Sequence, residues 1–300
     1  MALAAALLTR QRVAAMKLES VPGTAEVLAA ADAVANVFDM KLEPMITTVE
    51  REGQYSLSPL APVPGATAGK ATFKTELTTA TTFMTSLLNS CGLATSTPFI
   101  PVSADFTPAT VGSFIAGRYF QIHSAMGKFT MTAEAGKPAL LDVEYNGIWD
   151  APTAVALLGS VAYPLTIPPR VASCTFTLGG TTFLVPKIEL VVDNTLTMRE
   201  DVTNASGYAG CCISARKISV KVSPEAMALG TKDWFAAHMA STQVAMNLII
   251  GTCTIACPKL ALLNPPGYED SNGIYRDALE FVSVRSAAAG DDELSITWSA

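Results

Sequence analysis

Few residues of this 300-residue chain have the types and spacing that acid–base, nucleophilic or metal chemistry requires. The two histidines, His123 and His238, are too far apart in the sequence to form a metal-binding motif by spacing alone. Cys253 and Cys257 are separated by three residues, and no Cys-x-x-Cys pair accompanies them, so their spacing does not fit a structural zinc site. The Gly-x-Ser-x-Gly pattern of a serine nucleophile is absent. We therefore expect a protein that is not an enzyme and that carries no cofactor or metal.

The segment GATAGKA at 65–71 invites comparison with a phosphate-binding loop. That loop needs four residues between its glycines and a serine or threonine after its lysine. Here three residues separate the two glycines, and an alanine follows the lysine. We therefore interpret the segment as a hairpin loop that leads into a strand.

Alternation of apolar and polar residues predicts that strands dominate the chain. In GKATFKTELT, residues 69–78, the residues Phe73, Thr75 and Leu77 take every second place, which is the period of a strand with one buried face. Asp142 and Glu144 lie on the solvated face of another such segment and do not indicate a catalytic pair. The same reasoning predicts strands at 38–51, 70–78, 127–135, 139–146, 183–192, 195–200, 216–223, 244–252, 279–285 and 293–299.

Two segments have the pattern of a helix. In the first, 81–92, Phe83, Leu87 and Leu88 share one face, and Gly92 is placed to cap the C-terminus. In the second, 231–241, we expect the side chains of Trp234, Phe235 and Met239 to point inward.

The order of these elements suggests an internal repeat. RKISVKVSPE at 216–225 has the alternation of GKATFKTELT, and each follows a glycine-containing loop. Offsets between matching residues run from 147 positions (Lys74 to Lys221) to 153 (Tyr145 to Trp298), with Phe129 matched to Phe281 in between. Nearly constant offsets in unbroken order are typical of a tandem duplication. The alternative is that alternating strands match one another anywhere in a β-rich chain.

On this basis we expect a mainly β protein with two tandem, related β-sandwich or barrel-like domains, each flanked by an α-helix. The expected divisions are an N-terminal arm at 1–35, a first domain at 36–150, a connector at 151–179 and a second domain at 180–300. Phe73, Val220, Phe129, Val143 and Ile296 should fill the domain cores.

Composition points to interfaces between subunits. Half of the residues are hydrophobic, only 15% are charged and the mean hydropathy is +0.34, yet no apolar run reaches the roughly 18 residues of a membrane span. The surplus apolar surface should therefore lie at subunit contacts. The net charge of −6 argues against binding nucleic acid by neutralising its phosphates. The N-terminus does not read as a signal peptide, so the six cysteines are expected to be buried thiols in a reducing cytoplasm.

Several segments resemble the tail tube (major tail) proteins of long-tailed bacteriophages. They are QRVAAMKLESVPGTAEVLAAADAV at 11–34, GKATFKTELT with the later LLNSCGL, GKFTMTAEAGKPALLDVEYNGIWDAP at 127–152 and the C-terminal YRDALEFVSVRSAAAGDDELSITW. Together they cover about two-thirds of the chain. Many tube subunits are one such domain, whereas this chain has the pattern of two.

The resemblance implies inner sheets that join around a ring into a ring-wide β-barrel, and a long hairpin loop that reaches the neighbouring ring. It implies stacked rings that conduct double-stranded DNA, assembled in the host bacterial cytoplasm and located in the virion tail, with no membrane contact. The partners would be other copies of the chain and the tail terminator, distal tail and tape measure proteins. Sixfold rings are usual in the family, so two domains per chain imply a homotrimer with pseudo-sixfold symmetry.

We expect the loops 52–68 and 201–210 to project and to contact another subunit, mostly in an adjacent ring. The residues expected in these contacts are Tyr55, Leu57, Leu60, Val63, Asn204 and Tyr208. The residues expected to face the channel are Thr72, Lys74, Glu76, Glu134, Asp142, Glu144, Ser219 and Lys221. The acids of this polar face outnumber its lysines, so the channel should be neutral to negative.

Two other readings share the strand pattern. A β-sandwich adhesin or capsid decoration protein would have similar strands but no need for extra apolar interface. An enzyme on a β scaffold is disfavoured because no catalytic constellation is found.

Overall fold

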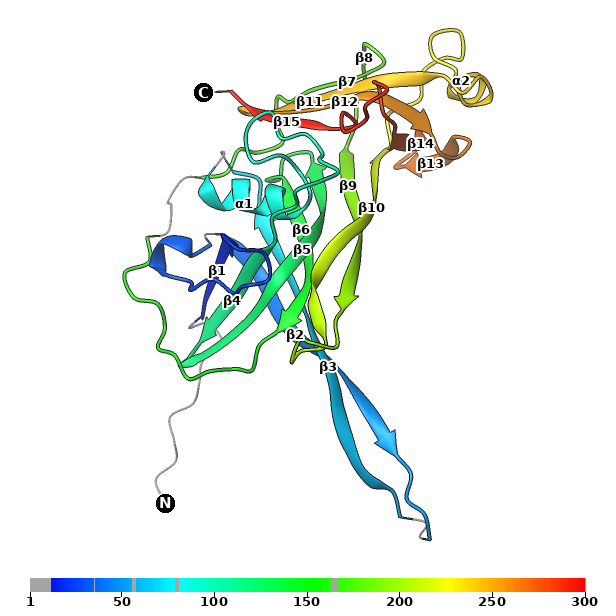
Figure 1. Cartoon of the computed structure of the whole chain (residues 1–300). Coiled ribbons are helices and arrows are strands. Elements are labelled where there is room, and N and C mark those ends of the chain that lie inside the picture. Colours follow the sequence, from blue (N-terminus) through cyan, green and yellow to red (C-terminus); the bar gives the residue numbers. More distant parts are fainter. Residues whose placement is uncertain (1–11, 35, 56–57, 79–80, 163–166, 300) are drawn as a thin grey trace.

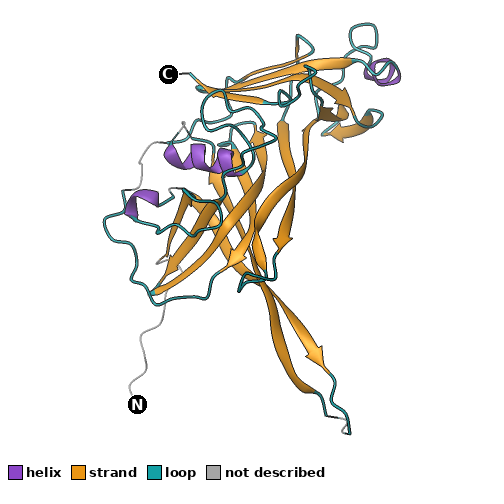
Figure 2. Cartoon of the chain, viewed as in Figure 1, coloured by secondary structure: helices purple, strands orange, loops and turns teal. Residues whose placement is uncertain are grey.

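The computed structural model describes residues 12–34, 36–55, 58–78, 81–162 and 167–299, and it is mainly β. The strands form one large antiparallel sheet that remains open, and two short α-helices pack against it (Figures 1 and 2). The mainly β class predicted from the sequence is therefore confirmed.

The elements of the first half are β1 (Arg12–Leu18), η1 (Ala30–Asp32), β2 (Val37–Arg51), β3 (Leu60–Glu76), α1 (Thr82–Ser90), β4 (Ala109–Ile115), β5 (Arg118–Glu134) and β6 (Leu140–Trp149). Their strands pair in the order β1-β4-β5-β6-β3-β2, and every pair is antiparallel. The helix α1 stands between β3 and β4 in the sequence. Thr81 caps it by accepting a hydrogen bond from the backbone N–H of Met84, and Gly92 follows it with a φ of +81°.

The elements of the second half are β7 (Thr175–Leu178), β8 (Thr181–Thr182), β9 (Lys187–Glu200), β10 (Tyr208–Val222), α2 (Trp234–Met239), β11 (Gln243–Ile250), β12 (Cys253–Leu262), β13 (Gly267–Ser271), β14 (Ile274–Ser283) and β15 (Ser295–Trp298). Six of these strands pair in the order β7-β11-β12-β14-β10-β9, again all antiparallel. The helix α2 stands between β10 and β11.

The two halves thus follow the same order of strand pairing, with the helix in the same place. They also share an irregularity. Where β4 meets β5, the register shifts between Ala109 and Val111, and where β11 meets β12 it shifts between Val244 and Met246. In both halves the two successive pairs are two residues apart on the earlier strand (β4 or β11) and three residues apart on the later strand (β5 or β12), which is a β-bulge with one extra residue.

The late matches of the repeat predicted from the sequence are wrong in detail. Phe281 lies on β14, which takes the place of β6 in the pairing order, so its counterpart is Val143 rather than Phe129. Trp298 lies on β15, which has no counterpart in the first half. Sequence alternation could not distinguish neighbouring strands of equal period.

The two halves meet edge to edge along β5 and β9. Six residue pairs join these strands, from Phe129 opposite Val192 to Glu134 opposite Lys187. Beyond the ladder, the buried amide of Asn194 on β9 donates hydrogen bonds to the carbonyls of Cys91 (2.7 Å) and Gly127 (2.8 Å). The second half is therefore tied to both α1 and β5 of the first.

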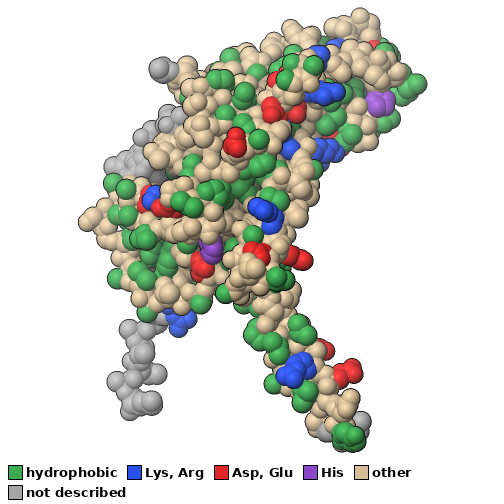
Figure 3. All heavy atoms as spheres, viewed as in Figure 1, with side chains coloured by type: hydrophobic (Ala, Val, Ile, Leu, Met, Phe, Trp, Pro, Cys, Tyr) green, Lys and Arg blue, Asp and Glu red, His purple; other side chains and the backbone are tan. Residues whose placement is uncertain are grey.

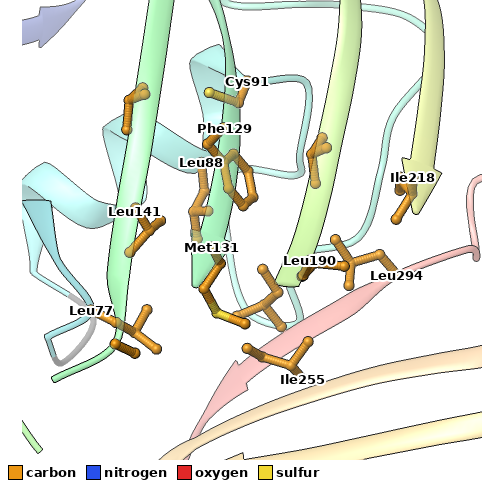
Figure 4. Close-up of a cluster of buried hydrophobic side chains, with 14 of the residues drawn as sticks. Leu77, Leu88, Cys91, Phe129, Met131, Leu141, Leu190, Ile218, Ile255 and Leu294 are labelled. Carbon is orange, nitrogen blue, oxygen red and sulfur yellow. The ribbon is translucent and has the colours of Figure 1, made fainter. Parts of the chain in front are cut away.

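The apolar faces of both halves belong to one cluster. Figure 4 shows Leu88 of α1, Met131 of β5, Leu190 of β9 and Leu294 near the C-terminus among its members. The predicted core residues, all confirmed as buried, are Phe73, Phe129, Val143, Val220 and Ile296. The C-terminal strand closes the cluster because Phe99 and Ile296 exchange backbone hydrogen bonds of 2.9 and 3.0 Å.

Several predicted boundaries are wrong. The expected hairpin loop GATAG lies inside β3, where Gly69 is needed because a Cβ would come within 2.6 Å of Ile122 and 2.9 Å of Trp149. The segments 183–192 and 195–200 were expected as two strands, but Lys187–Glu200 is one strand. Helix α2 is shorter than 231–241.

The orientation predicted for α2 is also wrong. Of the three side chains expected to point inward, only Trp234 is buried, whereas Phe235 is 58% exposed and Met239 is 71% exposed. The strands β1, β4, β7, β8, β12 and β13 were not predicted, although burial alternates from Cys253 to Cys257 in β12.

All six cysteines are free thiols. The expected burial is confirmed for four of them, Cys91, Cys211, Cys253 and Cys257, where loss of hydration raises each pKa to about 12. It is wrong for Cys174 and Cys212, which are partly exposed.

We expect Leu190→Ala, which truncates a fully buried side chain at the β5–β9 junction, to lower the free energy of unfolding by about 2–5 kcal/mol. The matched control is Leu184→Ala at a 70% exposed position, which should change it by about 0.5 kcal/mol or less. Urea denaturation followed by tryptophan fluorescence measures both. Equal effects of the two substitutions would contradict the packing of β9 against β5.

Iodoacetamide at pH 8 should modify only Cys174 and Cys212 in the folded protein, because the thiolate is the reactive form and burial suppresses it at the other four positions. Since these four thiols have raised pKa values in the folded state, their contribution to stability is present below pH 9 and is lost as the pH rises towards 12. Peptide mass mapping with and without urea tests the labelling. Rapid labelling of Cys91 in the folded protein would contradict it.

Candidate assembly surfaces

A two-stranded hairpin projects from the body of the chain (Figure 1). Pairing of β3 with β6 begins at Ala68, so the described residues 46–55 and 58–67 form a ribbon beyond the sheet. We call this ribbon the arm. The β-branched run from Ile46 to Val49 favours an extended strand on one side of it, and Pro62 and Pro64 on the other side lack an N–H to pair with a further strand.

Figure 3 shows apolar side chains on the visible side of the arm, and strand alternation places exposed apolar residues on both of its faces. Met45 at its base and Ile46 are consecutive in β2, so they point to opposite faces, and they are 50% and 44% exposed. Val49 lies opposite Val63, and both are about half exposed. An isolated two-stranded ribbon is marginally stable in water, and exposed apolar groups add to this cost. Both faces of the arm are therefore suited to contact with another molecule.

The residues expected in inter-ring contacts fall into two groups. Tyr55, Leu60 and Val63 lie on the arm and are exposed, although 60–68 are strand and not loop. Leu57 lies outside the described residues.

The second expected loop does not project. Asn204 lies in the exposed turn between β9 and β10, and Tyr208 is half-buried at the start of β10. This turn packs on its own chain, because the N–H of Thr67 donates to the carbonyl of Ser206 at 2.9 Å. Gly207 permits the approach, since a Cβ there would come within 2.9 Å of the Ala66 methyl group.

The residues expected to face a channel lie mostly on one polar face of the sheet. Lys74 on β3 lies opposite Asp142 on β6, with 3.1 Å between Nζ and the carboxylate. Lys70 contacts Glu144 at 2.9 Å, and Lys128 on β5 lies 4.0 Å from the same carboxylate. These ion pairs run across three neighbouring strands, and all of their members except Lys70 line a hollow in the polar face.

The second half carries a matching pair. Lys221 on β10 lies opposite Glu280 on β14, with 3.6 Å between Nζ and the carboxylate. Lys74 and Asp142 occupy the same places in the pairing order of the first half. On β9, the hydrogen bond to Glu189 raises the pKa of Lys187 above its ordinary value.

The remaining residues that were predicted to face the channel are partly exposed, with the exception of Ser219. Thr72, Glu76 and Glu134 are intermediate in exposure, and Glu134 pairs with Lys137. Ser219 is only 7% exposed, between Val191 and Val282 on the adjoining strands, so its expected place on the solvated face is wrong.

One polar network was not foreseen from the sequence. Nδ1 of His123 lies 2.9 Å from the carboxylate of Asp150, which also accepts a hydrogen bond of 2.5 Å from Gln121. Tyr119 donates to the same Gln121, and its own burial raises its pKa. No spacing in the sequence could have paired residues brought together by the β5–β6 register. The network joins the ends of two strands.

Within the described ranges, no group of three or more His, Cys, Asp or Glu side chains is arranged to hold a metal ion. No described helix is long and apolar enough to cross a membrane. Protein-family models and curated proteins were compared with the chain, and none matched.

We expect the double substitution Val49→Ser and Val63→Ser, on the arm, to change the free energy of unfolding by less than about 1 kcal/mol, because both side chains already contact water. The control Val143→Ser, at a position that is 3% exposed, should cost about 2–4 kcal/mol. Denaturation of freshly isolated, unassembled protein makes the comparison. A large loss in the arm variant would mean that the arm packs on its own chain.

Proposed function

We propose that the protein is the structural subunit of a bacteriophage tail tube, which stacks as rings into a channel that conducts double-stranded DNA. One observation carries the proposal: the same order of six paired strands occurs twice in the chain, and the two occurrences are joined edge to edge by β5 and β9. A chain built this way contains the repeating contact from which a ring can be made.

Each half is, on this proposal, one tube-type domain, at 36–150 and 180–300. The shared pairing order, the shared bulge, the helix in the same place and the matching Lys–carboxylate pairs support a tandem duplication. The connector 151–179 then includes β7, which pairs with β11 as β1 pairs with β4.

The ring closes by repeating the β5–β9 contact between chains. In the shared pairing order, β2 of the first half has the place that β9 has in the second half. In the same way, β12 and the residues after it have the place in the second half that β5 has in the first. β2 is an edge strand, and its described residues have no partner strand beyond β3. Pairing of β2 with residues 262–264 of another copy would cover the exposed β2 edge. Three chains would then supply six domains around a pseudo-sixfold ring-wide β-barrel.

Two features hinder the β2 edge of a single chain from pairing with another strand. Asp39 has a φ of +51° within a bulge between Phe38 and Lys41, and Nη1 of Arg12 donates to the carbonyl of Met40 at 3.2 Å. Bulges and charged side chains are common protections of a sheet edge. Joining to another copy therefore requires Arg12 to move, and Pro265 and Pro266 keep the new ladder short.

The polar face suits a passage for DNA. Lys70, Lys74, Lys128 and Lys221 of this face pair with carboxylates, which reduces their attraction for phosphates, whereas Arg12 and Lys41 beside them have no ion pair among the described residues. In this role the partners are other copies of the chain, the tail terminator, distal tail and tape measure proteins, and DNA in transit. The location is the virion tail after assembly in the host cytoplasm. A monomeric adhesin or capsid decoration protein would leave the apolar arm uncovered.

A disulfide tests the ring contact. Thr130 on β5 lies opposite Val191 on β9. By the shared pairing order, Leu263 corresponds to Thr130 and Lys41 corresponds to Val191, so these two residues should face each other across the contact between chains. In a chain with Cys174→Ser and Cys212→Ser, the pair Lys41→Cys and Leu263→Cys should crosslink between chains after mild oxidation. Non-reducing electrophoresis should show a covalent series that ends at three chains.

The control is Thr130→Cys with Val191→Cys in the same background, which should crosslink within one chain and reports the yield that this geometry allows. Crosslinking of the control alone would contradict the ring contact. A series that continues to six chains would contradict the trimer.

A further inference from the structure

The helix α2 presents an uncovered apolar face. Phe235 and Met239 are four residues apart, so they lie on the same side of the helix, and both are more than half exposed. Trp234, which points in a different direction from the helix, packs on the sheet, with its ring centroid 5.8 Å from that of Phe183 and 5.7 Å from that of Phe281. Leu229, just before the helix, is 74% exposed.

The matching helix of the first half is covered on more than one side. In α1 the apolar residues Met84, Leu87 and Leu88 are buried, and so are the polar residues Ser86 and Asn89. The chain itself provides this cover, because β1 packs on α1 and the segment containing Leu294 and Ile296 joins the same cluster. No described segment does the same for the outer face of α2, so the second helix has the position of the first without its cover.

The arm lies at the other end of the molecule (Figure 1). Its apolar faces have no partner among the described residues, and its end carries Glu50 and Glu52 with Arg51 between them, a net negative charge with no ion pair among the described residues. Near α2, Nζ of Lys232 lies 4.4 Å from the centre of the Trp234 ring and pairs with no described carboxylate. Apolar surface and unpaired charge at the two ends are therefore complementary.

We propose that the outer face of α2 receives the arm of another copy of the chain. The inference rests on the proposed function, since it names the acceptor of the contact between rings. Phe235 and Met239 bury one apolar face of the arm, and Lys232 meets the carboxylates at its end. A contact between unlike ends of identical molecules leaves a free arm at one end and a free helix at the other, so stacking continues into an open tube.

Two complementary variants test the contact. The arm variant, Val49→Ser with Val63→Ser, retains the acceptor and loses the donor. The helix variant, Phe235→Ser with Met239→Ser, retains the donor and loses the acceptor. Assembly of each variant alone should stop at single rings, under conditions in which the unaltered protein forms tubes. Sedimentation velocity and negative-stain micrographs measure the size of the assemblies.

Mixed in equal amounts, the two variants should form pairs of rings and nothing longer, because only one kind of contact is intact in the mixture. The control Ala240→Ser, at an exposed position beside the helix end, should form normal tubes. Circular dichroism and the melting temperature confirm that each variant is folded.

Normal tubes from the helix variant, or a mixture that remains as single rings, would overturn the docking of the arm on α2 and leave the proposed function standing. If the unaltered protein does not form rings or tubes at any concentration, the proposed function itself is contradicted.

Discussion

Six residue pairs along one edge of β5 hold the two halves of the chain together, and the rest of the molecule depends on this ladder. It converts two sheets of the same pairing order into one continuous sheet, and it places Leu190 and Asn194 of the second half in the core of the first. Backbone pairing of this kind is independent of side-chain identity, so it can be repeated wherever a similar strand and a free edge meet. The free edge of β2 provides such a place.

The distribution of apolar surface follows from the same arrangement. The sheet and α1 are covered by other parts of the chain, whereas no segment that the structure describes covers the arm or the outer face of α2. Both uncovered surfaces stand at ends of the molecule (Figure 1). On the proposed assembly, lateral joining through strand edges and stacking through the ends are separate contacts, so they can be altered independently.

Part of this structure could be predicted from the sequence. Strict alternation located the strands around Phe73 and Val220 and identified which of their residues are buried, because a strand with one wet face has a period of two. The pairing of Lys74 with Asp142 could not be read from the sequence, since it depends on register between strands distant in the chain. The glycines of GATAG suggested a loop, but here glycine is needed where Ile122 and Trp149 press against a strand. The helix α2 was oriented wrongly because its apolar residues were assigned to a core within the chain, whereas two of them face outward.

A reconstruction of tubes assembled from the purified protein by electron cryomicroscopy tests the central claim most directly. The account predicts three chains per ring, six similar β domains around the channel, and β2 of each chain paired with the residues after β12 of its neighbour. Rings of six chains, or rings of three in which the β2 edge faces solvent, would contradict it.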